Sequence, residues 1–165
     1  MEAVDGEALG RSRGGLSSTL HLAVDTCCRV LAVILSAGQA GDNPHLIPLL
    51  DQVRPPLGYR RPAGWWFRVI ADKAYSARAT RGYLRRRRIA ATIPEKKDQL
   101  AQRRKRGARG GRPYTFDPEI YKRRNVVERA IARLKRYRAL ASRYAKRAVI
   151  HRSQILLVAT ADWLS

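Results

Sequence analysis

Alternation of apolar and polar residues predicts a β-hairpin in the first third of the chain. Leu20, Leu22 and Val24 share one side of an extended segment, with His21, Ala23 and Asp25 between them. A second strand is predicted over residues 29–36, which are rich in β-branched and other apolar side chains. A short turn over 26–29 joins the two segments, so we expect them to pair in antiparallel fashion.

Four further elements are predicted between this hairpin and residue 93. In order they are a helix over 44–53, a strand over 65–71, a helix over 76–86 and a strand over 89–93. Asp42 or Asn43 can cap the first helix, because Pro44 follows at a position that favours helix initiation. This order of elements predicts the α/β class, with a mixed sheet flanked by helices.

Asp72 directly follows the strand predicted over 65–71. An acid just past the carboxyl end of an apolar strand stands where open α/β sheets carry their chemistry. Aspartate is also among the best residues for capping a helix, and the residues after Asp72 fit a cap about equally well. Both interpretations stay open on the residues alone.

The last third of the chain predicts helices. Residues 120–150 contain no Pro or Gly and are dominated by strong helix formers, which predicts one long helix with a candidate bend over 137–146. A strongly apolar helix over 149–164 is predicted to pack in the core. The apolar stripe of the long helix consists of Val126, Val127, Ala130, Ile131, Leu134, Tyr137 and Ala141.

Four polar residues share another sector of the long helix. Tyr121, Arg124, Glu128 and Lys135 fall within about 60° of each other at helical spacing. Glu128 is the only acid from Tyr121 to Arg152, among twelve Lys and Arg, and neighbouring cations favour its ionised form. An ionised carboxylate is a hard ligand for Mg²⁺, and Arg124 and Lys135 could hold a phosphate beside it. The alternative is an ordinary basic helix in which the acid makes i, i+4 ion pairs.

Charge changes the picture from an ordinary α/β domain to a polyanion-binding one. The 165-residue chain is long enough for one domain with a core, yet its formal net charge is +21. Such a charge favours binding to phosphate backbones. The longest apolar run, residues 30–37, is too short to span a bilayer, and the N-terminus lacks the blocks of a signal peptide. Adjacent Cys27 and Cys28 are the only cysteines, which indicates reduced thiols in a cytoplasmic protein.

Two segments concentrate cations outside the predicted helices and strands. Residues 1–15 are interpreted as a flexible polar segment, in which Arg11 and Arg13 form either part of a linker or a phosphate-contacting loop. Residues 94–118 are predicted to stay mobile without a partner, as a solvated loop or as a clamp on the DNA backbone. The candidate DNA-binding residues of this second segment are Lys96, Lys97, Arg103, Arg104, Lys105 and Arg106.

The spacing Tyr-x2-Arg-x3-Glu-x6-Lys, formed by Tyr121, Arg124, Glu128 and Lys135, resembles the Y-R-E-K signature of DDE-class insertion-sequence transposases of the IS4-like group. Three further motifs resemble the family in the same order along the chain. They are residues 10–16 (GRSRGGL) before 21–25 (HLAVD), residues 38–42 (GQAGD) and residues 71–75 (ADKAY). Together the motifs cover nearly the whole chain.

The resemblance implies an RNase H-like fold in which three acids converge and bind two Mg²⁺ or Mn²⁺ ions. It implies that Asp72 is the second acid and Glu128 the third, both as catalytic metal ligands. Arg124 and Lys135 would offset charge on the phosphate, and Tyr121 would stack on a base or bond to a phosphate. The resemblance implies double-stranded DNA as a partner and two or more copies that pair element ends. Further candidate DNA-binding residues are Lys73, Arg129, Arg133 and Arg136.

The chain departs from the family pattern at the first acid. No predicted strand upstream of residues 10–15 carries one, and Asp25 and Asp42 are better explained as a turn residue and a cap. Residues 16–165 are therefore interpreted as a partial catalytic domain that lacks its first strand, with 94–118 as an insertion. We expect the isolated chain to be inactive and its two-metal site to need an upstream N-terminal half. The alternatives are a non-catalytic DNA-binding remnant and a basic RNA-binding protein.

Overall fold

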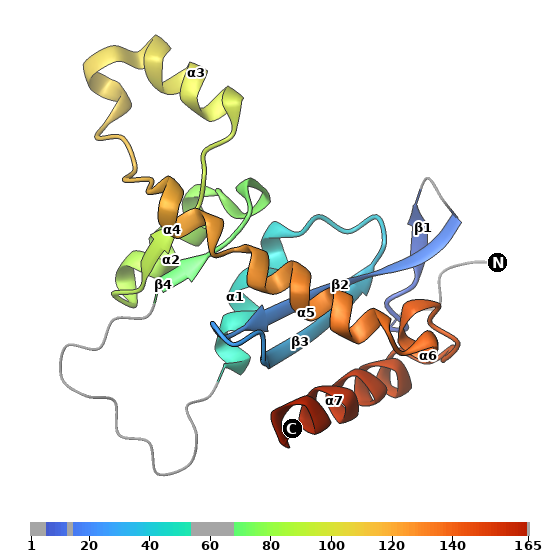
Figure 1. The fold of residues 1–165 in the computed structure, drawn as a ribbon. Coiled ribbons are helices and arrows are strands. Elements are labelled where there is room, and N and C mark those ends of the chain that lie inside the picture. The colour runs from blue at the N-terminus through green and yellow to red at the C-terminus, as the bar shows by residue number, and fades with distance from the viewer. Residues whose placement is uncertain (1–5, 13–14, 54–67, 165) are drawn as a thin grey trace. The chain divides into compact units, whose positions relative to one another are not determined.

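A computed structural model describes residues 6–12, 15–53 and 68–164 (Figure 1). The chain divides into two compact units. The first consists of Met1–Pro55 together with Asn125–Ser165, and the second of Pro56–Arg124.

The first unit is built on the predicted antiparallel hairpin. Strands β2 (Gly15–Val24) and β3 (Val30–Ala37) pair in antiparallel fashion, with a bulge near the end of β2. Asp25 closes the turn, because its Oδ1 accepts hydrogen bonds of 2.8 Å from the backbone N–H groups of both Cys27 and Arg29. The hairpin prediction is confirmed, and Asp25 is a turn residue, as its position in the sequence indicates.

Part of the N-terminal segment is ordered where the sequence predicts a loop. Strand β1 (Gly10–Ser12) pairs with the start of β2, so that Arg11 lies opposite Leu16. Upstream of β1, the Arg143 side chain donates hydrogen bonds of 2.6 and 3.0 Å to the carbonyl oxygens of Glu7 and Ala8. The Arg143 hydrogen bonds come from a residue far along the chain, which a local interpretation of a polar, Gly-rich segment does not include.

Helices cover both faces of the β2–β3 hairpin (Figure 1). Alternate residues of β2 face opposite ways: His21 stacks on His45 of helix α1, whereas Leu20 and Leu22 pack toward the core on the other face. That core centres on Val33, Leu134 and Ile155. The helices of this unit are α1 (Asn43–Gln52), α5 (Asn125–Lys135), α6 (Arg138–Ala141) and α7 (Ala148–Leu164).

The prediction of one long helix over 120–150 is wrong, because the structure contains separate helices in this range. Helix α4 (Pro118–Lys122) ends before a turn, in which the Arg124 N–H donates to the carbonyl oxygen of Tyr121 at 2.9 Å. Helix α5 then runs from Asn125 to Lys135, and the predicted bend is present as the short α6 and the turn after it. Strong helix formers continue through both breaks, so tertiary packing overrides local propensity here.

The second unit contains a pair of parallel strands that are joined in sequence by a helix. Strands β4 (Arg68–Ile70) and β5 (Ala90–Thr92) pair in parallel, and helix α2 (Arg78–Arg86) connects them. Leu84 of α2 and Ile93 after β5 are each 1% exposed. The predicted strand over 65–71 is confirmed from residue 68, while 65–67 lie outside the described residues. Antiparallel and parallel strands with covering helices give the chain the predicted mixed α/β character.

The basic segment over 94–118 contains secondary structure that the sequence reading did not predict. Helix α3 (Lys97–Arg106) is followed by the 3₁₀ helix η2 (Gly107–Gly110). The backbone N–H of Lys96 donates to the Gln99 side chain at 3.2 Å and so helps begin α3. Arg, Lys, Gln, Leu and Ala are all good helix formers, so a run of like charge still forms a helix when it is fastened to the unit.

Candidate functional site

Asp72 lies immediately past the carboxyl end of the parallel strand pair. The Ala71 N–H donates to the Thr92 carbonyl at 3.3 Å, which extends the β4–β5 ladder to the residue before Asp72. Asp72 also caps the 3₁₀ helix η1 (Lys73–Tyr75), and its Oδ1 accepts the Lys73 N–H at 2.5 Å. Asp72 therefore stands at the end of a strand and also caps η1, which are the two positions that its sequence context indicates.

Glu128 and Lys135 lie on one side of helix α5. They are seven positions apart. At about 100° per residue, seven positions bring a side chain back to nearly the same direction around the helix. Both side chains are exposed, whereas Ala130 and Leu134 on the opposite side are buried. The sequence prediction that Glu128 and Lys135 share a helix face is therefore confirmed.

Tyr121 and Arg124 belong to the other unit and form a small cluster of their own. The Arg124 guanidinium lies 5.8 Å from the centroid of the Tyr121 ring, and Phe116 packs against the same ring at 5.3 Å. Because the turn at residues 123 and 124 separates α4 from α5, the four signature residues do not share one continuous helix face. The structure brings Tyr121 and Arg124 together, and it places Glu128 and Lys135 on the same side of α5.

Asp72 and Glu128 each carry the kind of oxygen ligand that a hard divalent cation prefers. Within the described residues, no group of three or more His, Cys, Asp or Glu side chains could hold a metal ion. Asp72 lies in the second unit and Glu128 in the first. Both offer carboxylate oxygens at solvent-accessible positions, and such oxygens are the ligands that Mg²⁺ and Mn²⁺ prefer.

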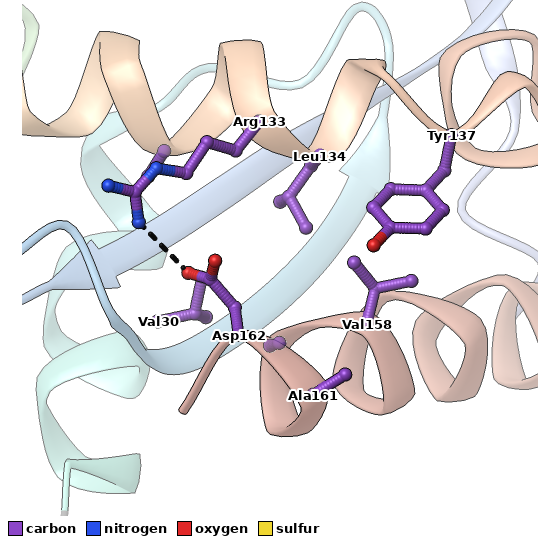
Figure 2. Close-up of a pocket in the computed structure, with 9 residues that line it drawn as sticks. Val30, Arg133, Leu134, Tyr137, Val158, Ala161 and Asp162 are labelled. Atoms are coloured by element: carbon purple, nitrogen blue, oxygen red, sulfur yellow. Dashed lines mark hydrogen bonds and ion pairs between the residues drawn. The ribbon is translucent and has the colours of Figure 1, made fainter. Parts of the chain in front are cut away.

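The candidate DNA-binding residues differ in their surroundings. Arg133 forms an ion pair with Asp162 of α7 at 3.1 Å, which the sequence reading missed. Figure 2 shows this pair beside a cavity of about 290 Å³ between β3, α5 and α7. Arg13 lies outside the described residues. The remaining candidates apart from Arg103 are exposed: Arg11, Lys73, Lys96, Lys97, Arg104, Lys105, Arg106, Arg129 and Arg136.

Arg103 is turned inward, unlike its neighbours on α3. Its guanidinium donates two hydrogen bonds, of 3.0 and 2.5 Å, to the two carboxylate oxygens of Glu95. The side chains of Arg103 and Glu95 are only 18% and 10% exposed. Tyr114 lies against both Arg103 and the buried Arg81. No local sequence signal marks this cluster, because its members come from four separate segments of the chain.

A buried polar group on the hairpin also escaped the sequence reading. His21 is 3% exposed and shares a 2.8 Å hydrogen bond with Ser36, while its ring stacks on His45 at a centroid distance of 4.4 Å. Burial lowers the pKa of His21, the nearby His45 lowers it further, and Asp42 raises it in part. The neutral ring therefore serves as a hydrogen-bonded packing element between the hairpin and α1.

The structure also bears on the cysteines and on membrane-spanning helices. Cys27 and Cys28 are both free thiols, as predicted. Among the described residues, no helix has the length and apolar character needed to cross a membrane.

Comparisons with known proteins identify the family of the chain. The family model described as "Transposase DDE domain" matches residues 6–162. The chain is 34% identical over 142 residues to a Burkholderia cepacia protein described as "Putative transposase for insertion sequence element IS402". That match covers 86% of this chain and 59% of the relative, so the chain spans about three-fifths of the relative's length. No solved structure matches the chain. The matched family model spans most of the chain, which therefore belongs to the transposase DDE domain family.

Proposed function

We propose that this chain supplies two of the acids and much of the DNA-contacting surface of a metal-dependent insertion-sequence transposase. The order Tyr121, Arg124, Glu128, Lys135 supports the Y-R-E-K group and, with it, an RNase H-like arrangement of the complete domain. The observation that carries the proposal is the position of Asp72, which its cap fixes at the carboxyl end of a parallel strand pair.

Asp72 and Glu128 are the proposed metal ligands. Bound Mg²⁺ or Mn²⁺ supplies Lewis-acid assistance to phosphodiester cleavage and strand transfer. Lys135, about two turns after Glu128 on the same side of α5, places a cation where it can contact a DNA phosphate. Arg124 is proposed to bind a second phosphate, and the Tyr121 ring to stack on a nucleotide base.

The first acid of the site is proposed to come from an N-terminal half of the protein. Within the described residues, β2 pairs along Ser18–Val24 with β3 alone, and β4 pairs with β5 alone. Each strand thus offers an edge at which a further strand can pair, and exposed edges favour such addition. We propose that the chain by itself does not cleave DNA and that the complete protein acts in two or more copies on two element ends.

DNA binding by the isolated chain tests the proposal without the missing strand. We expect duplex DNA to bind with an affinity that falls steeply with salt, because a chain of net charge +21 releases counterions on binding. Deleting residues 96–112 should make the slope of log affinity against log salt shallower by several units, at about 0.9 per lost phosphate contact. Fluorescence anisotropy over a salt series measures both quantities.

Two controls make that result interpretable. A variant that replaces Glu119 and Asp98, two exposed acids of the second unit, with their amides should bind DNA at least as tightly as the wild type. An unaltered salt slope after the deletion would show that the basic segment is a solvated surface. Tight DNA binding without any binding of divalent metal would instead favour a non-catalytic DNA-binding protein.

A further inference from the structure

We propose that Tyr114, held between the guanidinium groups of Arg81 and Arg103, is a positioning residue that determines which face of α3 meets the DNA backbone. This inference rests on the proposed function, since it concerns how the same basic segment grips DNA. It assigns a role to a residue that contributes no charge itself.

The Tyr114 ring lies against two arginine side chains. The guanidinium carbon of Arg81 lies 4.0 Å from the ring centroid, and that of Arg103 lies 4.9 Å from it. Both distances fall within the range of cation–π attraction. Arg81 is only 7% exposed and donates a 2.7 Å hydrogen bond to the carbonyl of Ile93, so it is anchored to the strand end. Tyr114 therefore links the basic segment to the buried part of its unit.

Arg103 forms an ion pair with Glu95. Two hydrogen bonds to one carboxylate fix the plane of the Arg103 guanidinium, and this bidentate geometry is the most specific that arginine makes. Gln99, one helical turn before Arg103, donates to the carbonyl of Ser76 at 3.3 Å. Two residues four positions apart thus tie the same side of α3 to the unit.

The bonds of Gln99 and Arg103 leave the opposite side of α3 facing outward. At about 100° per residue, Lys97, Arg104 and Lys105 point away from the side that carries Gln99 and Arg103. All three cations are exposed. Seven residues separate Lys97 from Arg104, which spans about 10 Å along the helix axis. The exposed Asp98 lies about 20° from Lys105 on the same outward side. The three cations of this outward stripe outnumber this single acid, so the outward side suits a row of backbone phosphates.

Arg106 provides an internal comparison. At the same helical spacing its direction lies about 60° from that of Arg103, back toward the tied side. Arg104 and Arg106 carry the same charge and are both exposed, yet only Arg104 belongs to the outward stripe. If the stack around Tyr114 fixes the orientation of α3, the two arginines should contribute unequally to DNA binding.

The test compares Tyr114→Leu with Tyr114→Phe, which keeps the aromatic ring. Limited trypsin digestion without DNA reports on the attachment of α3, which contains five Lys and Arg cleavage sites. We expect Tyr114→Leu to speed cleavage within α3 about tenfold, because local opening exposes those sites, and Tyr114→Phe to stay near the wild type. Glu95→Gln should act in the same direction, and it provides a second variant if Tyr114→Leu does not fold.

DNA binding supplies the second readout. Tyr114→Leu should lower DNA affinity about fivefold to tenfold, and Arg104→Ala should cost several times more affinity than Arg106→Ala. The Arg104 and Arg106 variants should become equal when Tyr114→Leu is present, which a simple loss of stability would not produce. If the wild type does not bind DNA, the proposed function fails and this inference fails with it. If the wild type binds DNA and Tyr114→Leu matches it in both affinity and digestion, only the role of Tyr114 is overturned.

Discussion

Buried His21 links the stability of the first unit to pH. Its pKa lies below the ordinary value of 6.5, chiefly because burial disfavours the charged ring, with His45 lowering it further and Asp42 opposing. The unfolded chain therefore takes up a proton at His21 more readily than the folded chain does. Stability from this group is present above about pH 6.5 and is lost as the pH falls toward the folded pKa.

Replacing this histidine should flatten the acid side of the stability profile. We expect His21→Gln to show a smaller decrease in the free energy of unfolding between about pH 7 and pH 5 than the wild type. Urea titrations at several pH values measure the decrease. His151, whose pKa is also lowered by burial and by Arg143, should account for part of the remaining slope. A His21→Gln profile parallel to that of the wild type would contradict the assignment.

At the scale of single residues, the sequence predicts where a residue lies in the fold better than which residues it contacts. The signals for Asp72 are local, namely an apolar strand before it and a cap sequence after it, and both are present in the structure. Arg103 looks like its neighbours in a basic run, yet it pairs with Glu95 and packs on Tyr114. A charge run indicates the kind of partner, but only tertiary contacts decide which of its members face inward.

At the scale of elements, the strongly periodic segments were predictable. The β2–β3 hairpin, α1, α2 and α7 all lie within a few residues of their predicted positions. The break between α4 and α5 carries no Pro or Gly, so propensity gave no warning of it. Strand β1 was missed because a strand of three residues is too short to show a periodicity of its own.

Helix α7 stabilises the first unit through one of its faces. Ile155 is 1% exposed against Val33 and Leu134, whereas Leu157, two residues further along, is 73% exposed. We expect Ile155→Ala to reduce the free energy of unfolding by about 2–5 kcal/mol. The matched control Leu157→Ala should change it by no more than about 0.5 kcal/mol. Chemical denaturation measures both, and similar losses for the two variants would show that this face of α7 is not the packed one.

For the whole molecule, charge and the division into units matter most. A net charge of +21 opposes a compact state through self-repulsion, and a bound polyanion relieves that repulsion. The two carboxylates proposed to bind metal come one from each unit.

The most direct measurement is isothermal titration of the chain with Mn²⁺. The account predicts a binding heat that Asp72→Asn and Glu128→Gln each abolish, because each variant removes one of the two anionic ligands. Asp98→Asn and Glu119→Gln, which remove exposed acids from the second unit, should leave the heat unchanged. Binding that persists in both Asp72→Asn and Glu128→Gln would contradict the proposed metal site and, with it, the catalytic role of this chain.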